Sequence, residues 1–256
     1  MQNQFKKQLV TDKQIEFGSF SQPIKNVNLL DAEIVPKIYL AKWMKDFRLK
    51  EFQAIQGGDD RYFFNVAIFN AKMTGLVQIR VFDIKAQKHY LYEKQILPIR
   101  MKIPNNIVDS KNVFVSKDLE IRIENKLEDN YIEVFFKAQG FVGMPDIEGR
   151  VTGLFINCDH MVASIPFAKN RGMYAHKSVV PMVGNIKLGD ENIEFSKDNS
   201  FFIVDDHKGY YPYIMKWDWI GAAFKSDIGL IGFSLTKNQT IDNEKYNENG
   251  IWINGK

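Results

Sequence analysis

A two-residue alternation of apolar and polar side chains is the feature that most limits what this 256-residue chain can fold into. In residues 119–124, Leu, Ile and Ile alternate with Glu, Arg and Glu, which is the period of a β-strand with one solvent-facing side. The same alternation recurs in residues 77–81, 113–115 and 132–136, with loops between them. The pattern therefore predicts an antiparallel meander and favours an all-β fold.

A β-hairpin is predicted over residues 186–195, because Gly189 and the Asx residues after it supply a turn between two apolar arms. Residues 61–69 and 230–235 are also rich in β-forming side chains, although they alternate less regularly. No repeat of the solenoid or propeller kind is visible. These strands extend the all-β prediction over most of the chain.

One segment departs from the strand pattern. Leu40, Trp43 and Phe47 recur at steps of three and four residues, and the fixed φ of Pro36 suits a first helical turn. The spacing predicts a short amphipathic helix near residues 36–47. Its expected role is to pack one aromatic face against a sheet or to close the end of a barrel.

Composition excludes several classes of protein. With 45% hydrophobic and 25% charged residues the chain is typical of a globular protein, and a net charge of +3 spread along it argues against nucleic acid as a partner. The single cysteine, Cys158, excludes an internal disulfide and fits a reducing compartment. No apolar run approaches the length of a signal peptide or a membrane span. We therefore expect a cytoplasmic protein without a membrane span.

Common catalytic motifs are missing from the sequence, which has no glycine-rich phosphate loop, no serine elbow and no paired histidines at metal spacing. The four histidines are scattered, so we expect neither a metal nor a cofactor. Cys158 lies two residues from His160, and in a strand that spacing places both side chains on one face as packing neighbours rather than as an attacking pair.

Residues 202–219 form the chemically densest stretch, FIVDDHKGYYPYIMKWDW. Its two ends are predicted as strands and its charged middle as a loop, with the turn near Gly209. Trp217 and Trp219 would share one face of a strand and either fill the core or line a cavity. Of Asp205 and Asp206, one is expected to cap backbone amides, whereas the other, in an apolar barrel mouth, would have a raised proton affinity and could act as a general acid.

Several stretches resemble a bacterial family catalogued only as domain of unknown function 2804. They are residues 48–52, 62–68, 176–184, 206–219, 232–235 and 247–252. The resemblance implies a fold and sites of interest but no activity, and members of this family usually extend past the segment around Trp252. More distantly, the expected architecture is similar to the lipocalin-like pairs of β-barrels in carotenoid 1,2-hydratases, which hold oily ligands.

Together these observations predict an all-β protein of antiparallel lipocalin-like barrels in two packed halves, residues 1–145 and 146–256. The boundary is expected in the glycine-rich region 140–153. Asn254-Gly255 is a strong hairpin signal with no return strand after it, so the second half is expected to be incomplete at its C-terminus.

Three functions compete. In the first, an apolar barrel pocket binds a lipid, a terpenoid or a polyketide-like molecule. In the second, Asp206 or Asp205 acts as the acid of a hydratase or isomerase on such a ligand. In the third, the interior is fully packed and the protein is structural or interacts with others, and the sequence leaves the oligomeric state open. The ligand-binding residues predicted at the mouth or wall of the pocket are His176, His207, Tyr211, Tyr213, Trp217 and Trp219.

Overall fold

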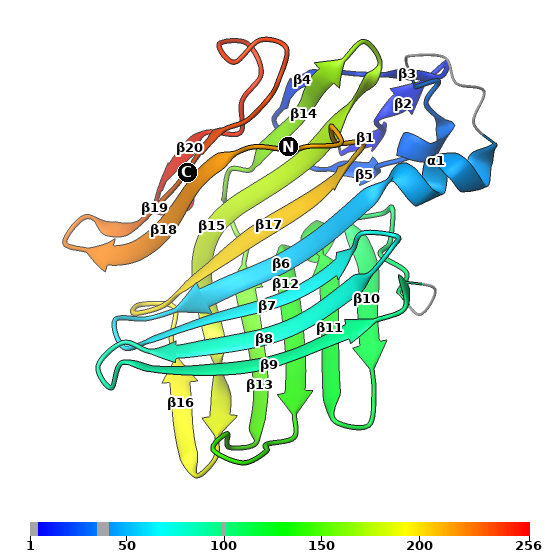
Figure 1. The fold of residues 1–256 in the computed structure, drawn as a ribbon. Helices are drawn as coiled ribbons and strands as arrows, with labels where there is room; N and C mark the ends of the chain where they lie inside the picture. Colours follow the sequence, from blue (N-terminus) through cyan, green and yellow to red (C-terminus); the bar gives the residue numbers. More distant parts are fainter. Residues whose placement is uncertain (1–4, 35–40, 99–100) are drawn as a thin grey trace.

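The structure, a computed structural model, describes residues 5–34, 41–98 and 101–256. Its largest element is a curled antiparallel sheet with the main strand order β10-β11-β12-β13-β15-β17-β6-β7-β8-β9 (Figure 1). The all-β prediction is confirmed. The terminal strands β9 and β10 are not hydrogen-bonded to each other, so the sheet is a half-barrel and not a closed barrel. Its strands are β4 (Gly18–Phe20), β6 (Lys50–Gly58), β7 (Tyr62–Asn70), β8 (Gly75–Asp83), β9 (Lys88–Ile96), β10 (Asp109–Val115), β11 (Leu119–Lys126), β12 (Tyr131–Ala138), β13 (Ile147–Leu154), β14 (Met161–Ala168), β15 (Arg171–Leu188), β16 (Glu191–Phe195) and β17 (Phe201–Gly209).

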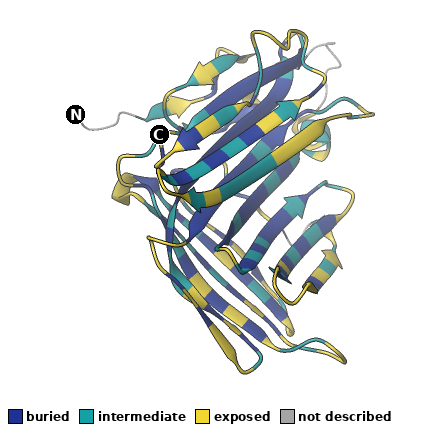
Figure 2. Cartoon of the chain, turned by 90° about the vertical axis from the view of Figure 1, so that its left-hand side faces the viewer, coloured by how far each residue is buried: buried dark blue, intermediate teal, exposed yellow. Residues whose placement is uncertain are grey.

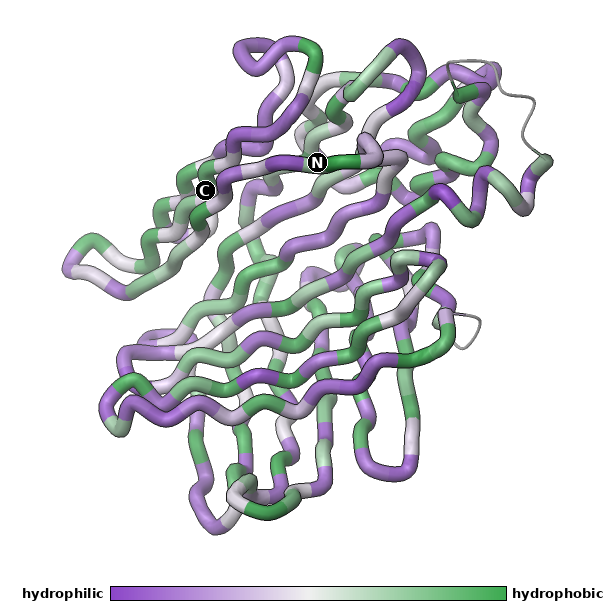
Figure 3. The backbone as a smooth tube through the Cα atoms, viewed as in Figure 1, coloured by the Kyte–Doolittle hydropathy of each residue, from purple (hydrophilic) through white to green (hydrophobic). Residues whose placement is uncertain are grey.

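The predicted meander forms, but the buried side expected in residues 113–115 is wrong, because Val113 and Val115 are exposed while Phe114 between them is buried. Ile121 and Ile123 of β11 are fully buried, whereas Arg122 between them is exposed. Along the strands, buried and exposed residues alternate (Figure 2), and so do hydrophobic and hydrophilic residues (Figure 3). In β11 and β12 the buried side faces the inside of the curl, because one face of a sheet must be removed from water for the sheet to be stable.

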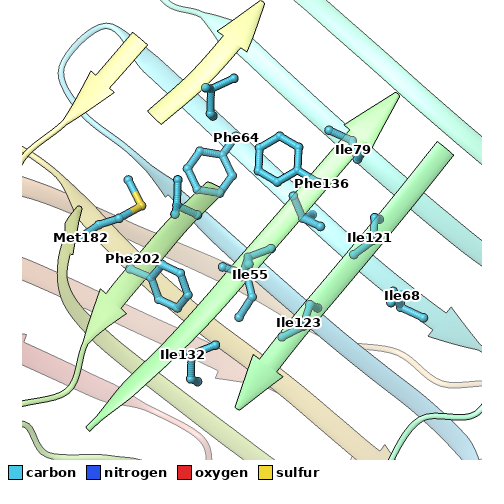
Figure 4. Packing of buried hydrophobic residues seen from close by; sticks show 14 of the residues in the cluster. Ile55, Phe64, Ile68, Ile79, Ile121, Ile123, Ile132, Phe136, Met182 and Phe202 are labelled. Atoms are coloured by element: carbon cyan, nitrogen blue, oxygen red, sulfur yellow. The ribbon is translucent and has the colours of Figure 1, made fainter. Parts of the chain in front are cut away.

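The concave side of the half-barrel is a packed core. The curl places β7 opposite β12, so the rings of Phe64 and Phe136 lie 5.8 Å apart between centroids. Ile55, Ile121 and Phe202 belong to the same cluster, which therefore joins strands from both ends of the sheet (Figure 4). This cluster fills the space where the sequence analysis expected a ligand pocket.

β15 is 18 residues long and changes partner on both of its edges. On one edge it pairs with β14 as far as Lys177 and with β13 from Met182. On the other edge it pairs with β17 as far as Pro181 and with β16 from Gly184. Pro181 falls in the gap between the ladders to β14 and β13, where a missing N–H group is tolerated.

The hairpin predicted over residues 186–195 is confirmed, since Ile186 of β15 pairs with Ile193 of β16. The turn predicted near Gly209 is displaced. β17 runs unbroken from Phe201 to Gly209, so its charged residues lie within a central strand and not in a loop. The strand persists because β15 and β6 flank it on both sides along its whole length.

A second, three-stranded sheet packs against the convex side of β15. It consists of β18 (Asp218–Ser226), β19 (Gly229–Lys237) and β20 (Gly250–Ile253). Leu230 and Trp252 of this sheet are buried against Val179 of β15. A Cβ atom at Gly232 would lie only 2.6 Å from both methyl carbons of Val179, so glycine is needed for this close approach.

The N-terminal segment covers one end of the large sheet. β1 (Lys6–Gln8) pairs in parallel with β5 (Ile24–Asn26), β2 (Val10–Thr11) pairs with β3 (Gln14–Ile15), and β4 extends the sheet beyond β14. A separate apolar cluster, which includes Leu29 of the 3-10 helix η1 (Leu29–Asp31) and Tyr210, fixes this segment. The other described 3-10 helix is η3 (Leu127–Asp129), between β11 and β12.

Helix α1 (Lys42–Arg48) confirms the C-terminal part of the predicted helix, whereas residues 35–40 lie outside the described residues. The expectation of a packed aromatic face is wrong, because Trp43 is 71% exposed and Phe47 is also exposed. The helix is short and is attached through polar contacts: the Lys45 ammonium donates hydrogen bonds to two backbone carbonyls of the preceding segment. Within the described ranges, no helix has the length and apolar character needed to cross a membrane.

The boundary predicted at residue 145 falls between β12 and β13, which pair along their full length. The large sheet is therefore continuous across this position. The division of the chain into two halves stays a prediction.

Candidate functional site

A pocket of about 560 Å³ lies between the large sheet and the segment that follows β17. β6, β7, β15 and β17 provide one side, and residues 211–219 with the end of β19 provide the other. Pockets that hold small organic molecules have volumes of roughly 300–1,000 Å³. The pocket is lined by Lys50, Glu51, Phe52, Phe69, Ala71, Met173, Lys177, Asp205, His207, Tyr211, Pro212, Met215, Trp217, Trp219, Thr236, Asn238 and Glu248.

The alternation of side chains along β17 decides which of its residues reach this pocket. Asp205 and His207 lie on the pocket side of the strand, whereas Asp206 lies on the opposite side with the packed core. The same rule places Lys177 of β15, the cross-strand neighbour of Asp205, on the pocket side. The large pocket is therefore on the convex side of the half-barrel and not inside it.

Four buried or nearly buried charged residues meet at one end of the pocket. Nε2 of His207 lies 2.9 Å from Oδ1 of Asp205 and 3.4 Å from Oε2 of Glu248. Nζ of Lys177 lies 3.1 Å from the same Oε2 of Glu248 and 3.6 Å from Oδ1 of Asp205. We call these four residues the ionic cluster. It contains two carboxylates and two basic groups, so its charges cancel when His207 is protonated.

Contacts within the ionic cluster shift the pKa values of the residues in and next to it. Burial alone raises the pKa of Asp205, but His207 and Lys177 outweigh burial and bring that pKa down to about 2. Burial alone lowers the pKa of His207, but Asp205 and Glu248 outweigh it and raise the pKa above its ordinary value. Burial, and then the charge of Glu248, raise the pKa of the Tyr211 phenol. At neutral pH, Asp205 is therefore ionised and Tyr211 is neutral, and the shift of the His207 pKa favours the protonated imidazole.

Aromatic rings surround the ionic cluster. Phe52 meets the His207 ring edge to face, with the centroids 6.3 Å apart, and meets Phe69 in the same manner. The Lys177 ammonium lies 5.4 Å from the centre of the Trp219 ring, which is a cation–π contact. Trp217 is 59% exposed and Trp219 is 42% exposed, although both line the pocket. The pocket thus combines apolar walls with a small polar end.

Asp206 and His176 face the other side of the sheet. Oδ2 of Asp206 lies 4.0 Å from Nδ1 of His176 and accepts a hydrogen bond from Gln53. Burial, and then the charge of Asp205, raise the pKa of Asp206 to about 8. Burial, and then His160, hold the pKa of His176 well below its ordinary value. Both groups are therefore uncharged at neutral pH, and neither lines the large pocket.

A small cavity of about 10 Å³ adjoins Asp206 on this side. Gln53, Ser110 and Asn125 also line it. This is about the size of one water molecule and is far too small for an organic ligand.

Tyr213 does not line the pocket. It is 85% exposed, and the guanidinium of Arg48 stacks 4.2 Å above its ring while donating a hydrogen bond to its hydroxyl group. Of the predicted site residues, the structure thus brings Asp205, His207, Tyr211, Trp217 and Trp219 together, and separates Asp206, His176 and Tyr213 from them.

Cys158 and His160 lie in the irregular segment between β13 and β14 and not in a strand. Sγ of Cys158 is 3.8 Å from Nε2 of His160, and Nδ1 of His160 is 3.0 Å from Nε2 of His176. Burial raises the pKa of Cys158 to about 12 and lowers the pKa of His160 to about 4. A protonated thiol beside a neutral imidazole fits packing neighbours better than an attacking pair.

Three important pocket residues were missed by the sequence analysis. Lys177 and Phe52 reach the pocket because β15 and β6 flank β17, and Glu248 reaches it from the connection between β19 and β20. Lys177 and Glu248 are buried charged residues, but nothing local in the sequence distinguishes them from surface charges. Among the residues that the structure describes, no group of three or more His, Cys, Asp or Glu side chains is arranged to hold a metal ion.

Fold and site together define a mostly-β protein built on a curled antiparallel half-barrel, with a pocket that could hold a ligand. The chain belongs to the family described as a domain of unknown function (DUF2804), whose model matches residues 4–256. Among curated proteins, none matches this sequence.

Two solved structures of CghA share the fold at 12% sequence identity. The match to CghA has a TM-score of 0.56 and covers 97% of this chain and 67% of that one. The match to CghA with Sch210972 has a TM-score of 0.57 and covers 96% of this chain and 66% of that one. The chain therefore spans about two thirds of the length of CghA, and the likeness shows the fold alone.

Proposed function

We propose that this protein binds a small apolar molecule, of the lipid, terpenoid or polyketide-like class, in the pocket beside β17. The observation that carries this proposal is a pocket of about 560 Å³ that is lined in large part by aromatic and aliphatic side chains. A pocket of that size with a few polar groups at one end is the usual form of a small-molecule site. Such a pocket also argues against the third function, a structural or interaction protein with a fully packed interior.

A protein with the same fold supports the proposal at the level of architecture. One of the two structures is of CghA with Sch210972. At 12% identity this likeness does not transfer a ligand to the present chain, but it is consistent with a molecule binding to a protein of this fold.

The enzyme alternative, a hydratase or isomerase with an aspartic acid as proton donor, finds less support. Asp206 has the raised pKa that a general acid needs, but it faces the core and does not reach the pocket. Asp205 reaches the pocket, but its pKa of about 2 keeps it ionised. We therefore favour binding over acid catalysis by either aspartate.

The binding proposal can be tested with pyrene, an apolar fluorescent probe. We expect pyrene to bind the wild-type protein, and we expect Trp219→Ala to weaken binding roughly five- to thirty-fold, because truncation of an aromatic side chain in a binding pocket removes about 1–2 kcal/mol. The measurement is a fluorescence titration that gives the Kd of each protein.

Trp43→Ala is the matched control, because Trp43 lies on α1 and is 71% exposed outside the pocket. It should bind pyrene as the wild type does. Equal Kd values for the wild type and for Trp219→Ala, or no binding to the wild type, would contradict the proposal.

A further inference from the structure

The ionic cluster leaves one polar group of His207 without a protein partner. Nε2 of His207 is engaged by Asp205 and Glu248, whereas Nδ1 has no hydrogen-bond partner among the described residues. The ring of His207 lines the pocket, and its side chain is 18% exposed. When both nitrogens are protonated, Nδ1 is a donor with no acceptor in the protein.

The charge of the ionic cluster limits what can accept this hydrogen bond. Asp205 and Glu248 balance Lys177 and His207 when His207 is protonated, so in that state the cluster is neutral before any ligand enters. A ligand carboxylate would add an unbalanced negative charge next to two buried carboxylates, which is unfavourable in a site shielded from water. A neutral oxygen would satisfy the donor without this penalty.

The walls of the pocket define the rest of the ligand. Phe52 packs edge-on against the His207 ring, and Trp219 and Tyr211 line the same space. Several other polar groups at this end contact one another, as Lys177 contacts Ser234 at 3.2 Å, whereas the buried hydroxyl group of Thr236 has no hydrogen-bond partner among the described residues. The ligand should therefore be apolar over most of its surface, with a single polar end directed toward His207.

We propose that the ligand carries a neutral oxygen, in a carbonyl or hydroxyl group, that accepts a hydrogen bond from Nδ1 of His207. This inference rests on the proposed function and deepens it, because it divides the candidate ligands by their polar end. Ketones, aldehydes and alcohols on a terpenoid or polyketide-like body fit, whereas free fatty acids do not.

A matched series of probes tests this inference: pyrene, 1-pyrenemethanol, 1-pyrenecarboxaldehyde and 1-pyrenecarboxylate. We expect the wild type to bind the alcohol and the aldehyde more tightly than the carboxylate. In His207→Phe, which keeps a ring against Phe52, the Kd values for the alcohol and the aldehyde should rise roughly tenfold more than the Kd for pyrene, as expected for loss of a hydrogen bond from a charged donor.

The ratio of the Kd of His207→Phe to the Kd of the wild type cancels differences in water solubility between the probes. An equal ratio for pyrene and for 1-pyrenemethanol would overturn the inference and leave the proposed function intact. Tighter binding of 1-pyrenecarboxylate than of 1-pyrenemethanol by the wild type would also overturn it, and this comparison needs no variant. Failure of every probe to bind, pyrene included, would overturn the proposed function and this inference with it.

Discussion

The side chains of Asp205 and Asp206 leave β17 on opposite sides, and the two surroundings set opposite protonation states. Asp205 meets two basic groups in the pocket, which hold its pKa at about 2. Asp206 meets neutral groups in the core, and the nearby charge of Asp205 adds to burial in raising its pKa to about 8. The ionised member of the pair thus helps to keep the other one neutral.

This difference predicts a dependence of stability on pH. The pKa of Asp206 is 3.8 in the unfolded chain and about 8 in the folded protein, so its contribution to stability is fully present below about pH 4 and is lost as the pH rises through about 8. Asp206→Asn cannot ionise. We expect the free energy of unfolding of the wild type, minus that of Asp206→Asn, to fall from about pH 5 to about pH 8, by at most about 1.4 kcal/mol per pH unit.

Urea unfolding at several pH values measures this difference. Asp227→Asn removes a carboxylate from an exposed loop and is the matched control, for which we expect no comparable trend. A difference between the wild type and Asp206→Asn that stays constant across the range would show that Asp206 is already ionised in the folded protein.

Individual site residues were predictable where chemistry is concentrated in the sequence. The stretch from residue 202 to residue 219 supplies Asp205, His207 and Trp219 to the pocket, and its density of rings and charges marks it without any structure. The side of the sheet that each residue faces was not predictable, because the charged middle of the stretch resembles a loop. Assigned to a strand, the same residues would have separated Asp205 from Asp206 by simple alternation.

At the scale of elements, the pocket depends on how closely β19 approaches β15. Gly232 faces Val179 with no room for a side chain, and the contact holds the three-stranded sheet against the large one. β18 and β19 carry Trp219 and Thr236 into the pocket. A shift of this small sheet would therefore change the shape of the pocket without touching the ionic cluster.

Gly232→Ala should push the two sheets apart. We expect it to reduce stability by roughly 1–3 kcal/mol, as overpacking does, to speed amide hydrogen exchange in β18–β20, and to weaken the binding of pyrene. The double variant Gly232→Ala with Val179→Ala should recover part of the loss, because Val179→Ala removes the methyl groups in the clash. Unchanged exchange in Gly232→Ala would mean that the sheets can adjust without separating.

Elements with regular alternation were the predictable ones. The strands around residues 77–81, 119–124 and 132–136 have one wet face and one buried face, so their period is visible in the sequence. Helix α1 shows the limit of such patterns. Its aromatic spacing predicted a buried face, but the rings are exposed and hydrogen bonds from Lys45 attach the helix to the preceding segment. Partners far apart in sequence, such as β6 and β17, depend on tertiary pairing and leave no local trace.

For the whole molecule, β15 connects the half-barrel to the layer that holds the pocket. One end of the strand contributes Ile186 to the packed core, and the other end contributes Met173 to the pocket. Its ladders to β13, β14, β16 and β17 all run through the same 18 residues. The packed core and the pocket are therefore connected by one continuous strand and do not merely contact each other.

This sharing predicts one cooperative unfolding transition. Ile186→Ala, which should cost about 2–5 kcal/mol as a large-to-small change in a core, is expected to shift the transition of the distant tryptophans around the pocket by as much as it shifts the loss of β-structure. Fluorescence and far-ultraviolet circular dichroism, recorded on the same samples, provide the two signals. Separate midpoints would instead favour two independently folding halves with a boundary near residue 145.

The length of β15 also limits how a protein of this design can diverge over time. At about 3.3 Å per residue the strand extends roughly 60 Å, and an insertion or deletion of one residue inside it would interrupt the register of one or two of its four ladders. Lineages that adopt new ligands would thus be expected to exchange side chains along the strand or to remodel the connection after Gly209, where changes in length disturb no ladder. The length of β15 would then stay constant among related proteins, while the sequence and length of the connection after β17 would vary.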